Sequence, residues 1–249
     1  MSSKITFFPV DNGDMTLIQI CNPLRSTILI DCNIRVAADN KSDSTPDVAK
    51  ALREQLNVDG DGRPYVDVML LSHPDKDHCS GFERHFWVGP LSDYADDDKE
   101  QGEKRIIIRQ IWSSPMVFRR ANRKEPLCSD AKVFKAEARR RVRVNQENGC
   151  SALDGDRILI LGEDQDGKTD SLGPILIKEG ESFNGINGQS SDFLTSHLLA
   201  PMAPQDDEKE EELSRNDSSV IINFDMAASQ ENTTQRSRFL TGGDAGVSI

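Results

Sequence analysis

The sequence predicts a mixed α/β protein, a four-layer sandwich in which two sheets pack together with helices outside. Three features predict it: short β-rich runs at the start, a buried strand between helices, and further strands in the second half. Residues 5–10, 16–21 and 26–32 are the β-rich runs, and the turn residues between them are typical of hairpins.

An amphipathic helix and a buried strand follow the hairpins. Residues 45–56 place Val48 and Leu52 on one face, and Pro46 lies just inside the start. Residues 65–72 are nearly all apolar, as expected of a strand that is covered on both faces. The loop after such a strand often carries catalytic groups, because the sheet aims the side chains while the loop stays accessible.

The second half of the chain continues this alternation. We expect helices over 80–86 and 130–144 and strands over 105–112, 156–161, 174–179, 218–225 and 238–243. Each sheet must bury a face, so this order favours two packed sheets with helices outside. The 249 residues suit a single domain, residues 1–249, with a basic helical insertion around 116–150 and an acidic loop around 203–216.

The composition excludes a membrane protein and favours the cytoplasm. No apolar run approaches the roughly 20 residues that a membrane span needs. The N-terminus lacks the features of a signal peptide. The five cysteines show no paired spacing, which indicates reduced thiols.

Charge is distributed unevenly along the chain. The formal net charge is −12, yet residues 119–143 contain ten Lys/Arg against three Asp/Glu. Clustered arginines on a helix are a common footprint for phosphates, so this block is a candidate nucleic-acid-binding surface; a solvated helix face is the alternative. The arginines that we assign to nucleic-acid binding are Arg139, Arg140, Arg141 and Arg143.

The segment LLSHPDKDHCSG, residues 70–81, carries the most specific chemistry. Four potential metal ligands fall within six positions directly after the buried strand: His73, Asp75, Asp77 and His78. Mixed imidazole and carboxylate ligands suit Zn²⁺, Mn²⁺ or Fe²⁺. Two such ions would lower the pKa of a bridging water and clamp the oxygens of an attacked phosphate or acyl group. The alternative is a polar loop that caps the next helix.

This segment resembles the signature loop of the metallo-β-lactamase-fold hydrolases. Its His-Pro-Asp-x-Asp-His pattern is most similar to the subgroup that includes the hydrolase domain of ComEC-type DNA-uptake proteins. Similar segments occur in order along the chain: PVDNGDMTLIQI at 9–20, TILIDCN at 27–33, RQIWSSP at 109–115, NDSSVIINFD at 216–225 and FLTGGDA at 239–245.

The resemblance implies roles for individual residues. His73, Asp75, Asp77 and His78 would bind two divalent ions, zinc or manganese, and Asp77 would also orient the nucleophilic water. Asp244 would bridge both ions, and Asp31 would support the loop from behind.

The chain departs from the family pattern in two respects. A second ion needs further histidines, and only His197 lies in the expected interval, outside the usual Gly-His context. The family also has a strand, a helix and a His-rich segment after the bridging aspartate, whereas this sequence ends at Ile249. We therefore expect one of three situations: the sequence is a truncated or processed piece of a longer protein, a protein partner or a second chain completes the C-terminal side of the fold, or the protein is a degenerate member.

Three functions agree with these observations. The first is a metal-dependent phosphodiesterase or nuclease that acts on nucleic acid or nucleotides. The second is a metallo-hydrolase of a lactone, a thioester or a β-lactam, which the absence of an apolar acyl-binding segment disfavours. The third is a degenerate or split subunit of a larger complex that works by binding a partner.

Overall fold

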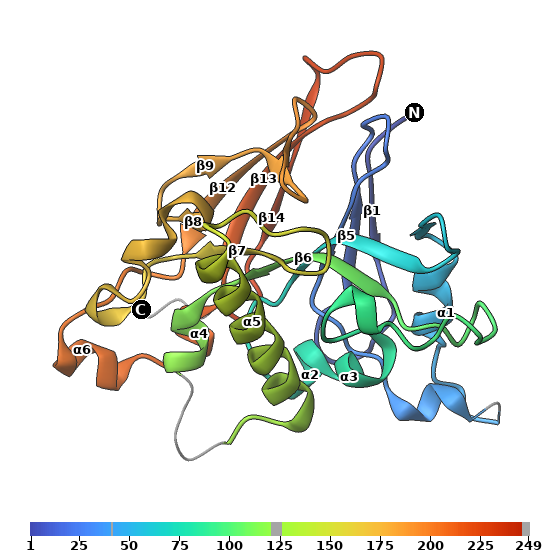
Figure 1. Cartoon of the computed structure of the whole chain (residues 1–249), viewed down its shortest axis with the longest axis horizontal. Helices are drawn as coiled ribbons and strands as arrows, with labels where there is room; N and C mark the ends of the chain where they lie inside the picture. The colour runs from blue at the N-terminus through green and yellow to red at the C-terminus, as the bar shows by residue number, and fades with distance from the viewer. Residues whose placement is uncertain (41, 121–125, 246–249) are drawn as a thin grey trace.

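Two β-sheets form the centre of the protein in the computed structural model, which describes residues 1–40, 42–120 and 126–245 (Figure 1). Part of the predicted basic insertion, residues 121–125, lies outside the described residues. The chain is mixed α/β, as predicted.

The larger sheet has eight strands in the order β1-β2-β3-β5-β6-β7-β8, with β4 paired to β5. They are β1 Lys4–Phe7, β2 Thr16–Gln19, β3 Thr27–Ile30, β4 Asn57–Val58, β5 Pro64–Leu70, β6 Ile107–Ser113, β7 Arg157–Leu161 and β8 Leu176–Ile177. The first three strands are antiparallel hairpins, as expected. Strands β3, β5, β6, β7 and β8 are parallel, so their carboxyl ends lie along one edge.

The smaller sheet is antiparallel, with the order β14-β13-β12-β9. Its strands are β9 Ser182–Phe183, β12 Leu194–Ala200, β13 Ile221–Ala227 and β14 Arg236–Thr241, and a short hairpin precedes β12, made of β10 Gly185–Ile186 and β11 Gln189–Ser190. The sequence motifs predict β13 and β14, but β9 and β12 were not expected.

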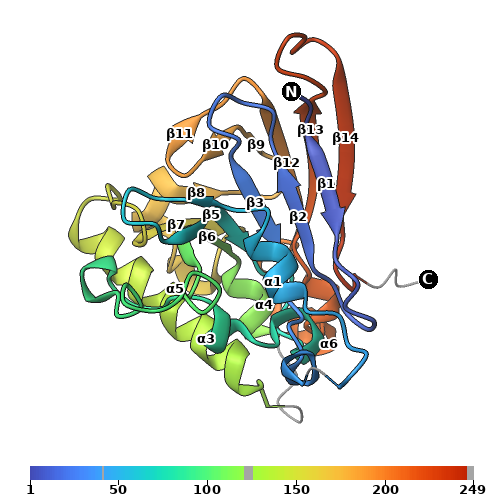
Figure 2. The ribbon, with the colours of Figure 1, turned by 90° about the vertical axis from the view of Figure 1, so that its right-hand side faces the viewer.

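Helices cover one face of the larger sheet (Figure 2). They include α1 Val48–Arg53, α2 Lys76–Cys79, α3 Phe82–His85, α4 Pro115–Arg119 and α5 Ser129–Glu147, while α6 Asp207–Glu212 follows β12. Leu52, Phe82 and Phe134 pack against Leu29 and Met69 of the sheet. None of the helices in the described ranges combines the length and the apolar character that crossing a membrane requires.

The opposite face of the larger sheet packs against the smaller sheet. Val68 and Trp112 of the larger sheet share a core with Leu198, Ile222 and Phe224. Because both faces of the larger sheet are covered, β5 is buried along nearly its whole length, which explains its continuous apolar sequence.

Helix α5 uses two of its arginines inside the protein. Arg141 is 1% exposed; its guanidinium pairs with Glu137 at 2.8 Å and donates to the carbonyl oxygens of Ile108 and Arg157. Arg140 bonds Glu137 and Asp156. The assignment of these two arginines to nucleic-acid binding is therefore corrected: Arg140 and Arg141 join α5 to the sheet, whereas Arg139 and Arg143 are exposed.

We expect Arg141→Met to lower the free energy of unfolding by about 3 kcal/mol, because two buried carbonyls lose their donor while Glu137 keeps Arg140 as its partner. Urea denaturation followed by circular dichroism measures the change. Arg143→Met is the matched control on the exposed face of α5 and should stay within about 0.5 kcal/mol of the wild type. Equal losses in the two variants would contradict the structural role of Arg141.

Candidate metal centre

The loop that follows β5 is clamped to the end of β3 by backbone hydrogen bonds. The amide of Asp31 donates to the carbonyl of Leu70, and the amide of Cys32 donates to the carbonyl of His78, both at 2.9 Å. Because β3 and β5 are adjacent parallel strands, their carboxyl ends deliver Asp31 and His73 to the same place.

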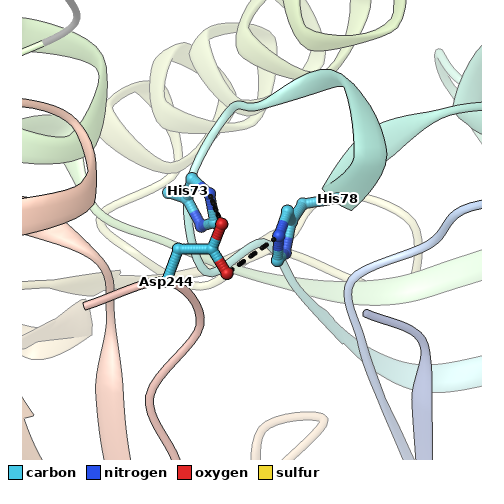
Figure 3. Close-up of side chains that lie close together, drawn as sticks. All are labelled: His73, His78 and Asp244. Atoms are coloured by element: carbon cyan, nitrogen blue, oxygen red, sulfur yellow. Dashed lines mark ion pairs between the residues drawn. The ribbon is translucent and has the colours of Figure 1, made fainter. Parts of the chain in front are cut away.

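Three side chains that the sequence singles out converge here: His73, His78 and Asp244 (Figure 3). The Nε2 atom of His73 lies 3.7 Å from one carboxylate oxygen of Asp244, and the Nε2 atom of His78 lies 3.4 Å from the other. Both rings are buried, and their centroids are 4.0 Å apart. Asp244 is half-exposed and closes the cluster from the solvent side.

Asp31 fixes the orientation and tautomer of both imidazoles. Its carboxylate accepts hydrogen bonds from the hydroxyl of Ser72 at 2.5 Å and from Nδ1 of His78 at 2.8 Å. The single hydroxyl proton of Ser72 is thus committed to Asp31, so its oxygen accepts from Nδ1 of His73 at 3.1 Å. In their neutral forms both histidines then carry their proton on Nδ1 and have the Nε2 lone pair on the side of Asp244, the arrangement that metal-binding histidines use.

The donor set fits a divalent metal ion. Both Nε2 atoms are buried and have no hydrogen-bond partner within the described part of the chain, which is costly for polar atoms unless a ligand satisfies them. Two ligand atoms of a tetrahedral zinc ion, each 2.0–2.1 Å from the metal, lie about 3.4 Å apart. The distances between Asp244 and the two histidines are close to this value.

Two glycines bring carboxylates close to the histidines. Gly243 has a φ of +49°, and a Cβ there would lie 2.8 Å from Oγ of Ser72. Gly13 has a φ of +87°, and a Cβ there would lie 2.1 Å from the carbonyl oxygen of Asp77. No larger residue fits either position, and the next residue in each case is an aspartate of the cluster, Asp244 or Asp14.

Asp14 is the residue of this cluster that the sequence reasoning did not single out. Ligand atoms of Asp14, Asp31 and His78 lie within 4.8 Å of one another. Burial, followed by the charges of Asp31 and Asp244, raises the pKa of Asp14. Only the family-like segment PVDNGDMTLIQI pointed to this residue, because an isolated DNGD is also an ordinary turn.

The titration of the two imidazoles agrees with a cation site. Burial, followed by the charge of His78, lowers the pKa of His73. Burial also opposes a charge on His78, but the hydrogen bond and charge of Asp31, with the charge of Asp244, raise its pKa to about 9. The carboxylates around His78 thus favour one positive charge at this place. In the absence of metal a proton on His78 supplies that charge, and a bound metal ion would replace the proton.

The other two residues of the loop have different partners. One oxygen of Asp75 lies 3.6 Å from Nε2 of His73, while the other accepts from Arg215 at 2.5 Å. The carboxylate of Asp77 accepts from the side chain of Asn12 at 3.2 Å and belongs to neither group of candidate ligands in the described ranges. The structure thus places Asp75 beside the cluster and does not bring Asp77 into it.

His197 lies away from the cluster. It is on β12 of the smaller sheet, paired with Asn223 of β13, and its Nδ1 atom lies 2.9 Å from Oγ of Ser182. It joins no group of candidate ligands among the residues that the structure describes. The arrangement therefore gives no support to the expectation that His197 binds a metal.

No protein-family model matches the chain, and a search of curated proteins finds no match. The family resemblance therefore stays a prediction, and the function must be argued from the geometry of the site.

We expect Asp31→Asn to weaken zinc binding by about 10–100-fold. One carboxylate oxygen of Asp31 accepts from the backbone amide of Ser72, and the other accepts from the Ser72 hydroxyl and from His78, so the NH2 group of an amide would face donors at one of these two positions. Competition with a chromophoric chelator measures the affinity. Asp67→Asn is the matched control, since Asp67 is also a buried carboxylate but bonds Thr27. Equal affinities of Asp31→Asn and the wild type would contradict the role of Asp31.

A fourth histidine, His85, gives a test of pH dependence outside the cluster. Burial, followed by the charges of Arg84 and Arg53, lowers its pKa to about 4. The unfolded value is about 6.5, so its contribution to stability is present above pH 6.5 and is lost as the pH falls to 4. We expect His85→Gln to reduce this loss by about 2–3 kcal/mol in urea denaturation at pH 7, 5.5 and 4. If the free energy of unfolding falls equally with pH in the wild type and in His85→Gln, His85 is not the cause of the loss.

Proposed function

We propose that the chain is a metal-dependent hydrolase of phosphodiesters that acts on nucleic acid or nucleotides. The observation that carries the proposal is the pair of buried Nε2 atoms that face the carboxylate of Asp244 and that have no hydrogen-bond partner among the described residues. A metal ion bound between the two Nε2 atoms and the half-exposed carboxylate would satisfy all three ligands at once, which hydrogen bonds to water would do less well.

His73, His78 and Asp244 would hold one ion. Asp14 and Asp75 flank these ligands and would extend the site towards a second, in agreement with the predicted zinc or manganese pair. A bound divalent ion supplies Lewis acidity and lowers the pKa of a water nucleophile. We further propose that Asp77 orients that water, as the sequence predicts, while the side chain of Asn12 donates a hydrogen bond to its carboxylate.

Two features favour a phosphodiester over an acyl substrate. The candidate ligands include several carboxylates, which suit the hard ions that assist phosphoryl chemistry. The exposed arginines of α5, Arg139 and Arg143, add positive charge to a chain whose net charge is negative. The proposal also includes the finer fold, a metallo-β-lactamase-like αββα sandwich, which the packing of the two sheets through a common core supports.

We expect the protein, stripped of metal and reloaded with Zn²⁺ or Mn²⁺, to hydrolyse bis(4-nitrophenyl) phosphate and to cleave DNA. Asp244→Asn should lower turnover at least about 100-fold, because it removes charge from the carboxylate that faces both histidines. Asp98→Asn is the control, since Asp98 is an exposed carboxylate outside both groups of candidate ligands.

The alternatives give different results in the same experiment. Much less than one metal ion per chain by elemental analysis would overturn the proposal and favour a degenerate, partner-binding subunit. Stoichiometric metal with hydrolysis of a lactone or thioester but no cleavage of phosphodiesters would favour the acyl hydrolase. Equal turnover in Asp244→Asn and the wild type would place the reaction elsewhere.

A further inference from the structure

A cavity of about 470 Å³ lies between α5 and the segments that follow β6 and β7, outside the candidate metal centre. This volume is in the range of small-molecule sites. Phe118, Val142, Ile158 and Ile160 are among the apolar side chains that line it. Its walls follow strands β6 and β7, whose carboxyl ends share an edge with β5 and the histidine loop, the edge at which α/β proteins commonly bind ligands.

The rim of this cavity is cationic. Its basic lining residues are Arg119, Lys135, Arg139, Arg143 and Lys168. Lys135, Arg139 and Arg143 are spaced four residues apart, so they form one row along α5 that extends over about 12 Å. Arg140 and Arg141 lie off this row and bond Glu137.

Only part of this positive charge is neutralised by residues that the structure describes. Arg119 pairs with Asp164, the one acidic residue among the described residues of the lining, and Lys168 pairs with Asp166. Lys135, Arg139 and Arg143 form no ion pair with any residue in the described ranges. Burial, followed by the charges of Arg139 and Arg119, lowers the pKa of Lys135, a sign that its ammonium group lies among other cations.

The apolar lining and the cationic row restrict the ligand. Phe118 contributes an aromatic ring, with Nζ of Lys135 5.4 Å from its centroid. A flat apolar group can pack on such a ring while anionic groups extend along the row. Inorganic anions would leave the apolar lining unused, and purely apolar ligands would leave the cations without partners.

We propose that this cavity binds consecutive phosphate groups together with a nucleobase, supplied either by a nucleoside polyphosphate or by a short stretch of single-stranded nucleic acid. The choice of a nucleobase among flat apolar groups rests on the proposed function. The cavity would then hold part of the substrate, or a second nucleotide, apart from the metal ions.

The test measures binding to metal-free protein in the presence of a chelator, so that it does not depend on hydrolysis. Fluorescence anisotropy reports labelled pentathymidylate, and calorimetry reports a nucleoside triphosphate; thymidine and inorganic phosphate serve as competitors. We expect Arg139→Gln/Arg143→Gln to weaken binding at least tenfold and to flatten its dependence on salt. Lys132→Gln/Arg238→Gln is the control that removes the same charge from exposed positions outside the cavity, and it should bind within twofold of the wild type.

The outcomes separate the possible ligands. Strong binding of the triphosphate alone identifies a free nucleotide, and strong binding of pentathymidylate alone identifies a nucleic-acid strand; either supports the proposal. Equal binding by the cavity variant and the control overturns it. Competition by thymidine that is as strong as competition by the nucleoside triphosphate also overturns it, because thymidine has no phosphate. Binding to phosphatidylglycerol vesicles, but not to nucleotides, that is lost in the cavity variant assigns the cavity to a lipid surface and also overturns it. Hydrolysis of bis(4-nitrophenyl) phosphate, which is too short to need the cavity, continues to test the metal centre separately.

Discussion

The hydrogen bonds of the Asp31 carboxylate are the constraint on which the candidate site depends. They join the end of β3 to the backbone and hydroxyl of Ser72 and to the ring of His78, and through Ser72 they also determine the proton position on His73. Asp31 has a φ of 55°, a conformation that costs free energy for a non-glycine residue. The buried bonds on its carboxylate oppose that cost, and they require the parallel pairing of β3 with β5.

The packing of the two sheets supplies the rest of the cluster. Asp14 precedes β2 of the larger sheet, whereas Asp244 follows β14 of the smaller sheet, so their approach to the histidines requires both sheets to be assembled. Trp112 and Phe224 stack in the core between the sheets and help to determine the distance between the two sheets. Because the candidate ligands come from three segments far apart in the chain, and the supporting Asp31 from a fourth, the cluster forms only when the whole core has formed.

These contributions differ in how far the sequence could predict them. The loop from His73 to His78 is visible because its residues are contiguous and follow an apolar strand, whereas Asp244 needed the family resemblance and Asp14 is indistinguishable from a turn residue. Strands β9 and β12 were not expected. The polar and glycine-rich residues 180–192, which include β9, resemble a loop, and β9 depends on tertiary pairing with β12, which in turn pairs with β13. The burial of Arg141 was equally invisible, because it depends on carbonyl oxygens of β6 and β7.

Helix α5 connects the histidine loop to the basic cavity. At its start, the carboxylate of Asp130 accepts from the amides of Gly81 and Glu83, directly after the histidine loop. In its middle, Arg141 anchors it to the sheet, so the cations on the opposite face are held rigidly. The row from Lys135 to Arg143 begins about 8 Å and ends about 20 Å along the helix from Asp130. A helix fixed at both places sets the distance between the two sites, and a flexible strand that occupied both would meet them in a defined register.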